Sequence, residues 1–559
     1  MPYRQLRETG QALTRVHADV CVIGAGIAGL IAAVRLARSQ QLRVVVVESG
    51  VGKDDMAAGL FDQIDNPSPN YQGAMRARGL GGTSARWCGK LLPLSASDLE
   101  ARPWVDVPSW PFGFDELYRY RVEIERMMRV DAGSSESDAG AWLDVHGLLP
   151  ASDAEFATRW PKLPSAARHD LVHVLRAELE TRTNLTIWLG ATVTGFRFTP
   201  EQRVAEITAT NLTGQTVSIH AREYLIAAGT LESTRLMLVA DRQSGGAVSR
   251  TTDRLGRHFN DHLALHVAQL QPRPRVRRHV NRMLADRWLT GAARHLHFEL
   301  RPHVQQRHRV GSSYFDFALE MAHDSALSQR RLATHALRRG QLLSAAAHTK
   351  LLLSDLPSLW STLHWRLLDK QQCWPADASV YAKVWIEQLP LHRNRIVLSE
   401  KCDALGQPLI AVEFHRTQFE ERSLRTCVDR LKAFWSRHRL SEQCALEWAE
   451  GSFAADGSSV QAATEQAHPA GSTRMGNDPK TSVVDAHLRV HAMPNLSIAS
   501  AAVFPSSGSA NPTFTIMQLA LRAAEAIETK LEKQRRSVPC AVVMPLPAAA
   551  DAPLSARAR

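Results

Sequence analysis

The sequence lacks long apolar runs, clustered cysteines and a secretory leader. No stretch of about 18 apolar residues occurs, so no membrane-spanning helix is expected. The first twenty residues contain no continuous apolar core with a small-residue cleavage site, so we predict no signal peptide and a cytoplasmic location. The seven cysteines are scattered and form no CxxC pair, which indicates reduced thiols and no metal site.

Zinc-finger, helix-turn-helix and RNA-recognition motifs are also missing, so no nucleic-acid partner is predicted despite a formal net charge of +11. Much of this charge lies in residues 273–309, which hold ten arginines against Asp286 and Glu299. Such a segment is usually a solvated face. The alternative is contact with a phosphate-rich surface or an acidic substrate.

The front of the chain contains a complete strand–turn–helix–strand unit. It reads DVCVIGAGIAGLIAAVRLARSQQLRVVVVESG over residues 19–50. The apolar run at 20–23 predicts a buried strand, and the one at 44–47 predicts a second strand that ends at Glu48. Small and apolar residues between the two runs recur at helical spacing. This order is typical of a nucleotide-binding α/β unit.

Three glycines of this unit have the GxGxxG spacing of dinucleotide-binding turns. Gly24 permits the tight turn, Gly26 lets a pyrophosphate approach the backbone, and Gly29 lets the helix pack closely on the strand. The helix N-terminus attracts phosphate, and Glu48 can accept hydrogen bonds from ribose hydroxyls. The alternative is a glycine-rich turn of another α/β protein, and the motif alone does not distinguish FAD from NAD.

A second glycine-rich segment, RGLGGTSARWCG, covers residues 78–89. Gly79, Gly81, Gly82 and Thr83 make it flexible, so it can bring backbone N–H groups against a diphosphate or a flavin edge. The alternative is an ordinary surface loop.

The stretch HPAGSTRMG, residues 468–476, places a histidine before a proline and a small-residue turn. From the residues alone, His468 is either a turn residue or a catalytic base, because a neutral imidazole accepts protons near neutral pH. Asn511 precedes Pro512 and a long apolar-periodic helix that is predicted from Thr515. An asparagine directly before a proline at the start of a helix is also typical of a helix N-cap.

Seven motifs, in order along nearly the whole chain, resemble those of the glucose–methanol–choline (GMC) oxidoreductase family. They are DVCVIGAGIAGLIAA near the start, GLGGTSARW at 79–87, YLIAAGTLESTRLML at 224–238, LGRHFNDH at 255–262, NRIVLSEKCDALGQP at 394–408, HPAGSTRMG at 468–476 and VVDAHLRVHAMPNLSIASAAVFPSSGSANPTFTIMQLALRAAEAI at 483–527. The ending FPSSGSANPTFTI is most similar to the sugar-oxidising branch, which includes fructose and gluconate dehydrogenases and pyranose oxidases.

The resemblance implies FAD-dependent oxidation of an alcohol group of a sugar, glycoside or polyol, with hydride transfer to flavin N5. It makes His468 the base and Asn511 the residue that orients the substrate oxygen without competing for the proton. The flavin contacts it implies are Gly24, Gly26, Ile27, Ala28, Gly29, Glu48, Gly81, Gly82, Thr83, Ser84, Val193, Ala228, Gly229, Ala501, Pro512 and Thr513.

Two positions depart from patterns within the family. Arg86 stands where some pyranose oxidases carry the histidine that links the flavin, so non-covalent FAD is expected. Ser500 stands where many members carry an aspartate, and the sugar branch often lacks that aspartate.

The resemblance also implies a fold of α/β and α+β type, with a Rossmann-like FAD-binding domain and an interposed antiparallel-sheet substrate domain. The FAD-binding domain is predicted to be discontinuous, because its motifs lie at both ends of the chain. Its parts are 1–95, 186–265 and 465–530, and the substrate-binding parts are 96–185 and 266–464.

Three patterns refine this organisation. Apolar residues alternate from Val380 to Ile386, which favours a strand. The segment 326–372 changes to helical spacing and is predicted to be an insertion packed on the sheet; the alternative is a membrane-facing or substrate-gating lid. The tail, 535–559, is rich in alanine and proline and is predicted to be disordered. The apolar residues of the helical pattern are Leu356, Leu359, Trp360, Leu363 and Leu367.

Several functions stay open on the sequence. The leading interpretation is a dehydrogenase for a small-molecule alcohol or sugar, and the second is an oxidase that uses O₂, because the sequence does not identify the electron acceptor. A sterol-type oxidase would be favoured if the segment 326–372 bound lipid. A non-catalytic flavin-binding protein is disfavoured, because both His468 and Asn511 are present.

Overall fold

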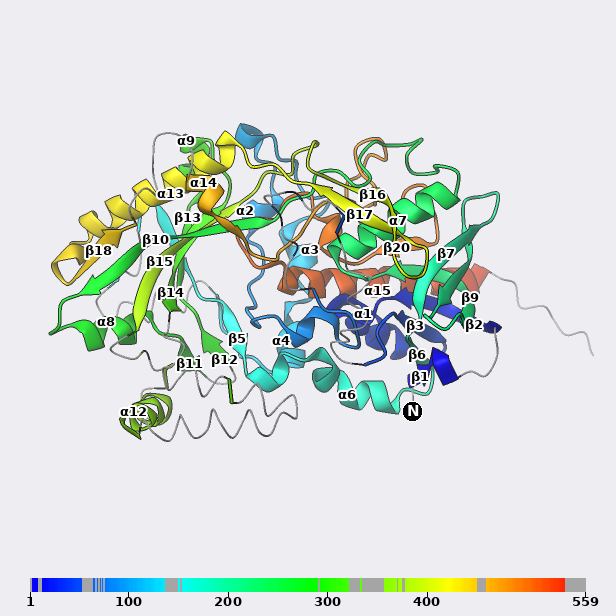
Figure 1. The fold of residues 1–559 in the computed structure, drawn as a ribbon, viewed down its shortest axis with the longest axis horizontal. Helices are drawn as coiled ribbons and strands as arrows, with labels where there is room; N and C mark the ends of the chain where they lie inside the picture. Colours follow the sequence, from blue (N-terminus) through cyan, green and yellow to red (C-terminus); the bar gives the residue numbers. More distant parts are fainter. Residues whose placement is uncertain are drawn as a thin grey trace, which may run out of the picture.

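Two large β-sheets lie toward opposite ends of the long axis of the molecule (Figure 1). The computed structural model describes residues 3–8, 13–52, 64–65, 68, 71, 73, 76–135, 149–150, 153–289, 292–320, 332–333, 356–368, 370–372, 374, 378–449 and 459–537. Among these residues, no helix is both long and apolar enough to cross a bilayer.

The first sheet is mainly parallel and contains the predicted nucleotide-binding unit. Its order is β1 (Tyr3–Gln5), β6 (Leu185–Leu189), β3 (Val44–Glu48), β2 (Leu13–Ile23), β9 (Thr216–Ile226), β8 (Val204–Thr210) and β7 (Thr192–Phe198), and β20 (Leu496–Ile498) also pairs with β9. Pairing is parallel among β1, β6, β3, β2, β9 and β20. The strand β8 pairs antiparallel with both of its neighbours, β9 and β7. The strand β3 reads VVVVE and is buried throughout, as expected for a parallel strand covered on both faces.

Two helices from opposite ends of the chain pack together on this sheet. They are α1 (Ile27–Ala37) and α15 (Pro512–Ser537). The first predicted strand, helix and second strand are therefore present, and the C-terminal helix begins at Pro512, directly after Asn511, as the N-cap interpretation predicts. Of the predicted disordered tail, residues 535–537 are the end of α15, and residues 538–559 lie outside the described part.

The second sheet is antiparallel and has a helix on one face. Its order is β18 (Cys444–Trp448), β10 (His262–Pro272), β15 (Ser379–Glu387), β14 (Ser313–Glu320), β13 (His297–Leu300) and β4 (Phe156–Arg159), and β19 (Thr464–Glu465) pairs with β10. The alternation predicted for β15 is present: Val380, Ala382, Val384 and Ile386 are buried. Both β14 and β15 contact α13 (Gln418–Arg437), so the opposite face of these strands is free to line a cavity.

Two hydrophobic cores accompany the two sheets. The first core also includes Leu117 and Ile124 from α3 (Phe114–Tyr118) and α4 (Arg121–Met128), and Leu171 and Leu179 from α6 (Leu171–Thr181). These helices lie in the segment 96–185, which the sequence assigns to the substrate-binding domain. The remaining principal elements are α2 (Ala96–Leu99), β5 (Lys162–Pro164), α7 (Thr230–Gln243), α8 (Arg277–Leu284), β11 (Arg287–Leu289), β12 (Ala292–Arg294), α9 (Pro302–His308), α12 (Leu356–Leu367), β16 (Arg395–Cys402), β17 (Pro408–Glu413) and α14 (Ser459–Ala462).

The helix α12 is the main described part of the predicted helical insertion, most of which lies outside the described residues. The prediction that its apolar pattern packs on the sheet is wrong for Trp360, Leu363 and Leu367, whose exposed fractions are 73%, 51% and 69%. The helix instead buries Trp365, and Arg366 lies over the Trp288 ring at 3.5 Å. Periodicity shows that apolar residues share a face, but it does not show where that face points.

The arginine-rich segment 273–309 is only partly a solvated face. Arg273, Arg275 and Arg278 are exposed, as the simpler interpretation predicts. Arg294 is buried, donates to the Trp160 carbonyl at 3.0 Å and forms an ion pair with Asp131. Part of the local charge is therefore neutralised inside the protein.

Candidate active site

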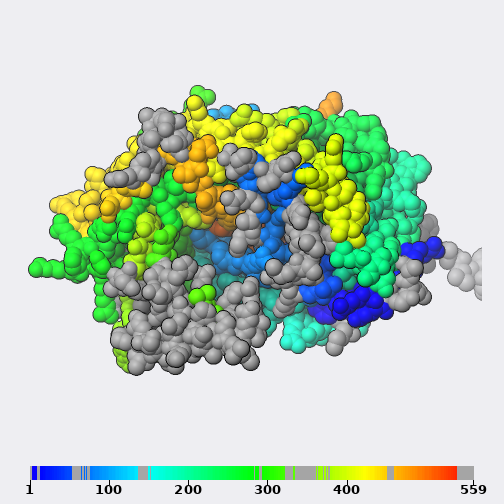
Figure 2. All heavy atoms as spheres, viewed as in Figure 1, coloured from blue at the N-terminus to red at the C-terminus, as the bar shows by residue number. Residues whose placement is uncertain are grey.

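A cavity of about 590 Å³ is lined by residues from both sheets. Figure 2 shows a hollow between the two parts of the molecule, where atoms of the N-terminal and C-terminal segments lie side by side. The cavity begins at the glycine turn of β2 and α1 and reaches His468 and Asn511. Because one cavity includes both regions, a single ligand could span the nucleotide-binding unit and the candidate catalytic residues.

The GxGxxG turn has the geometry of a site that receives a ligand against the backbone. Gly24 has φ +103°, and a Cβ atom on Gly29 would lie 1.9 Å from the Gly24 carbonyl oxygen, so neither position accepts a side chain. A Cβ atom on Gly26 would meet nothing within 4 Å, because it would point into open space. Any larger side chain there would occupy space in the cavity that Gly26 lines.

The second glycine-rich segment packs against the first. A Cβ atom on Gly82 would lie 2.9 Å from the Gly26 Cα atom, and the Gly81 N–H donates to the Ala25 carbonyl at 2.9 Å. The N-terminus of α1 begins at the same place, so its first N–H groups and dipole favour an anion there. These observations fit the diphosphate of an FAD molecule.

The buried carboxylate of Glu48 joins three backbone segments beside this turn. Its oxygens accept the N–H groups of Ala25 at 2.8 Å, Gly50 at 2.9 Å and Gly79 at 3.1 Å. Burial raises the pKa of Glu48 despite these hydrogen bonds. Glu48 lines the cavity as well, so it is placed both to hold the two glycine segments together and to meet a ribose.

His468 and Asn511 meet at the other end of the cavity. The Asn511 Nδ2 atom lies 2.9 Å from His468 Nε2, although 43 residues separate them. Asn511 immediately precedes α15, and the backbone N–H of His468 donates to Asp261 Oδ1 at 2.9 Å. The two residues that the family resemblance pairs are therefore in direct contact.

The surroundings of His468 keep its imidazole neutral. Burial is the main cause that lowers the pKa of His468 well below its ordinary value, and the nearby His262, Lys90 and Lys383 add to this effect. A neutral imidazole with a free nitrogen can accept a proton at neutral pH.

A polar and aromatic wall faces His468 from the second sheet. The Trp385 ring lies nearly parallel to that of His468, with 6.3 Å between centroids and 19° between planes. The Trp385 Nε1 atom donates to Asp316 Oδ1 at 2.8 Å, and Lys90 Nζ lies 3.3 Å from Asp316 Oδ2. Lys383 Nζ lies 4.2 Å from the centroid of the Trp385 ring.

The sequence interpretation missed this wall. Asp316 pairs with Lys383 in the register of β14 and β15, and Tyr314 pairs with Trp385, so all four belong to one face of the sheet. The signal was present in β15, where Tyr381, Lys383 and Trp385 alternate with the buried apolar residues. A polar face that carries tryptophan and lysine inside a substrate domain indicates a lining surface, not a solvated one.

Most of the predicted flavin contacts line the cavity. They are Gly24, Gly26, Ile27, Ala28, Glu48, Gly82, Thr83, Val193, Ala228, Gly229, Ala501, Pro512 and Thr513. Three others do not line it: Gly29, Gly81 and Ser84. Gly29 packs against Gly24, and the Ser84 hydroxyl donates to the Gly81 carbonyl at 2.6 Å and accepts from the Leu171 N–H. These three residues shape the loops from behind.

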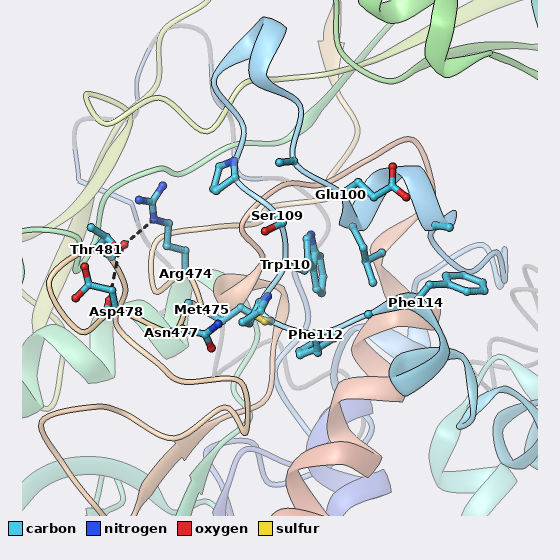
Figure 3. A pocket seen from close by; sticks show the side chains of 17 residues that line it. Glu100, Ser109, Trp110, Phe112, Phe114, Arg474, Met475, Asn477, Asp478 and Thr481 are labelled. Atoms are coloured by element: carbon cyan, nitrogen blue, oxygen red, sulfur yellow. Dashed lines mark hydrogen bonds between the residues drawn. The ribbon is translucent and has the colours of Figure 1, made fainter.

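A second cavity, of about 700 Å³, lies beside the same C-terminal motif (Figure 3). Trp110, Phe112 and Met475 line it, together with Arg474, whose Nε donates to the Thr481 carbonyl at 3.0 Å. The stretch HPAGSTRMG thus reaches both cavities, with His468 in the first and Arg474 in the second. Only the first cavity combines the glycine turns with the histidine and asparagine pair.

Comparisons with known proteins agree with this geometry. Residues 19–339 match the family model described as FAD dependent oxidoreductase, and residues 390–520 match the model described as GMC oxidoreductase. The chain is 24% identical to the paromamine 6'-oxidase of Streptomyces fradiae, over 91% of each chain. It is also 24% identical to the fructose dehydrogenase large subunit of Gluconobacter japonicus, over 93% of this chain and 99% of the relative.

Solved structures show the same fold at low identity. The pyridoxine 4-oxidase from Mesorbium loti aligns with a TM-score of 0.56 and 16% identity, over 91% of this chain and 99% of that one. A formate oxidase variant of Aspergillus oryzae aligns with a TM-score of 0.54 and 13% identity, over 93% of this chain and 99% of that one.

Proposed function

This chain belongs to the GMC family of FAD-dependent oxidoreductases, and from that premise we propose that it oxidises a CH–OH group of a small sugar, glycoside or polyol with His468 as the base. The observation that carries the proposal is the 2.9 Å contact between His468 Nε2 and Asn511 Nδ2. This contact lies at the end of the cavity that starts at the GxGxxG turn. The first sheet forms the FAD-binding part, and the antiparallel sheet forms the substrate-binding part.

The proposed reaction divides one oxidation between a proton and a hydride. His468 Nε2 accepts the proton of the substrate hydroxyl, so that the C–O bond becomes a carbonyl as the hydride leaves carbon. Asn511 donates a hydrogen bond to the substrate oxygen and orients the C–H bond without taking the proton. FAD, when bound, supplies the acceptor for the hydride. A positioned base of this kind typically contributes about 10²–10⁴-fold.

The wall opposite His468 supports a polyhydroxylated substrate. Trp385 offers an aromatic face for the C–H side of a sugar ring, and Lys90, which also lines the cavity, offers a donor for hydroxyl groups. A sterol would place apolar surface against the Lys90 ammonium group and take it out of water, which is costly. Two relatives carry the names of enzymes that act on paromamine and fructose, in agreement with a sugar-like substrate.

The finer proposal for the cofactor is non-covalent attachment. Arg86 lines the cavity at the position where the resemblance would place a linking histidine, and its Nη1 donates to the Arg76 carbonyl at 2.9 Å. A guanidinium does not form such a linkage. The phosphate and ribose contacts of the glycine turn and Glu48 would then hold FAD.

The test is anaerobic bleaching of the flavin in the purified holoenzyme with a panel of sugars, glycosides, sterols and simple alcohols. We expect bleaching by members of the sugar or polyol class. Bleaching by sterols alone would overturn the substrate class, and failure with every alcohol would overturn the reaction. Admitting O₂ to the bleached enzyme then separates an oxidase, which reoxidises at once, from a dehydrogenase that needs another acceptor.

A further inference from the structure

A second histidine, His262, lies directly behind His468. It is the first residue of β10 and is only 3% exposed. Its Nδ1 atom lies 3.0 Å from His468 Nδ1, and its Nε2 atom lies 2.9 Å from the carbonyl oxygen of Gly508. The two rings meet edge to face, with 87° between their planes. Both ring nitrogens of each histidine therefore have a defined partner.

The direction of these hydrogen bonds follows from the Gly508 carbonyl, which can only accept. His262 must carry a proton on Nε2. Burial lowers the pKa of His262, so the ring is neutral and its Nδ1 atom is an acceptor. The His468 Nδ1 atom must then be the donor, and the single proton of this neutral ring lies there.

The contact with Asn511 agrees with this direction. With its proton on Nδ1, His468 has a lone pair on Nε2, and the Asn511 amide can donate to it. The reverse direction would need protons on both nitrogens of His262, which its burial disfavours. The hydrogen bonds therefore run from Asn511 to His468, then to His262 and finally to Gly508.

Two acidic residues, Asp261 and Glu387, hold the backbone around this pair of rings without bonding to either ring. Asp261 Oδ1 accepts the backbone N–H groups of both His262 and His468, at 2.7 and 2.9 Å. Glu387 pairs with His262 in the register of β10 and β15, and its Oε1 accepts the Gly508 N–H at 2.9 Å. The charge of Glu387 is balanced by Arg102, whose Nη2 lies 2.8 Å from its Oε1.

On the cavity side, Lys90 and Lys383 both disfavour a positive charge on His468. The groups around His262 and His468 thus fix the backbones of both residues and the Gly508 carbonyl, while the two imidazole rings form a hydrogen bond with each other.

We propose that His262 is a positioning residue that holds His468 in the tautomer with its proton on Nδ1, so that Nε2 keeps its lone pair, which accepts from Asn511 in this structure and can accept the substrate proton. This inference rests on the proposed role of His468 as base. Without an acceptor at Nδ1, the ring can place its proton on Nε2, where it cannot take up the substrate proton. After proton transfer, the Nδ1–H group of the imidazolium still donates to His262, which stabilises the charged ring. In other enzymes, a histidine base held in the wrong tautomer loses up to about 10⁴-fold in rate.

A matched pair of substitutions tests this role. In His262→Asn, the amide oxygen takes nearly the place of the imidazole Nδ1 atom and can accept from His468. In His262→Leu, a side chain of the same shape offers no acceptor. We expect substrate reduction of the bound flavin to slow by at least about 10²-fold in the Leu variant and by less than about tenfold in the Asn variant. Flavin content should be unchanged in both.

A spectroscopic measurement reports the tautomer independently of activity. In holoenzyme labelled with ¹⁵N-histidine, the ring signals of His468 are assigned by their loss in His468→Gln. We expect wild-type shifts of a protonated Nδ1 and an unprotonated Nε2, and we expect Nε2 to gain proton character in His262→Leu. This readout also covers the case in which a His262 variant does not fold, because the wild-type shifts alone then decide.

Three outcomes would overturn the inference: a wild-type ring protonated on Nε2, normal reduction rates in His262→Leu, or equal losses in the Asn and Leu variants, which would indicate packing alone. Failure of the proposed function would give a result that can be told apart from these three outcomes. If His468→Gln reduces normally, His468 is not the base, whereas the ring shifts still report whether His262 sets its tautomer.

Discussion

The rings of Trp385 and His468 are nearly parallel, with 6.3 Å between their centroids and 19° between their planes, and both residues line the cavity. One ring comes from the antiparallel sheet and the other from the C-terminal motif, so their contact spans the two parts of the molecule. A substrate between the nucleotide end of the cavity and this pair would meet His468, the proposed base, and the aromatic ring of Trp385 together.

The first prediction concerns the base and its partner. His468→Ala should keep FAD bound but slow anaerobic flavin reduction by at least about 10²-fold. Because the pKa of His468 lies well below its ordinary value, the wild-type rate should stay flat from neutral pH upward and fall only on the acid side. Asn511→Ala should slow reduction but keep this acid limb, which the His468 variant should lose. The acid limb lies well below the ordinary histidine pKa of about 6.5, so stopped-flow measurements must run from the lowest pH at which the holoenzyme stays folded up to about pH 9. Near-normal rates in His468→Ala would assign the base elsewhere.

The second prediction concerns the approach of the FAD pyrophosphate to the backbone of Gly26. Gly26→Val should fold but lose most of its flavin, because the added side chain would stand in the open space that a Cβ atom on Gly26 enters. Gly113→Val is the matched control: Gly113 also caps a helix, with φ −79° like Gly26, and its Cβ atom would also meet nothing within 4 Å. Flavin absorbance per protein should stay normal in the control. Normal flavin in Gly26→Val would mean that the nucleotide lies elsewhere.

The third prediction concerns attachment of the cofactor. Acid or heat precipitation of the purified protein should release the flavin into the supernatant, since the cavity presents Arg86 where a linking histidine would stand. The measurement is flavin fluorescence in the supernatant and in the washed pellet. Flavin that stays with the precipitated chain would contradict non-covalent binding.

The fourth prediction concerns the substrate wall. Trp385→Ala should raise KM for a sugar substrate by about tenfold, because it removes the aromatic face and the donor to Asp316. Trp385→Phe keeps a face beside His468 but loses the N–H group, so its KM should be intermediate. Trp360→Ala is the control, because Trp360 is 73% exposed on α12 and should leave KM unchanged. Equal KM values in all three variants would remove Trp385 from substrate binding.

The fifth prediction concerns pH and stability. Burial raises the pKa of Asp261 to about 8. Because the unfolded carboxyl has a pKa near 4, the folded state binds more protons between about pH 4 and 8. The contribution of Asp261 to stability is therefore lost as pH rises through this window.

Asp261→Asn keeps the acceptor for the His262 and His468 N–H groups but does not titrate, so its melting temperature should fall less between pH 5 and 8 than that of the wild type. Asp261→Ala orphans both N–H groups and should cost about 1–3 kcal/mol at either pH. An identical pH slope in the wild type and the Asn variant would show that Asp261 does not carry this effect. The neighbouring Glu465 raises the pKa of Asp261 further, and it is present in all three proteins.

The nucleotide end of the site could be predicted from the sequence, because its chemistry is local. Gly24, Gly26 and Gly29 lie within six residues, and the strands on either side show their burial through unbroken apolar runs. The helix and strand assignments there depend on short-range backbone preferences and on period, which a sequence carries directly. The wrong packing face of α12 shows the limit of the same reasoning, because period does not reveal what covers a face.

The family and the flavin unit could be predicted from the sequence alone, because each rests on motifs with a fixed order and spacing. The pair His468 and Asn511 was predicted in the same way, and the structure places the two side chains in contact. The side chains that surround this pair became visible only in the folded protein. His262 lies 206 positions before His468, and Asp316 lies 69 positions before Trp385, yet each forms a hydrogen bond with its partner. Such contacts depend on strand register and on the docking of two sheets, which a long-range fold sets and a local pattern does not encode.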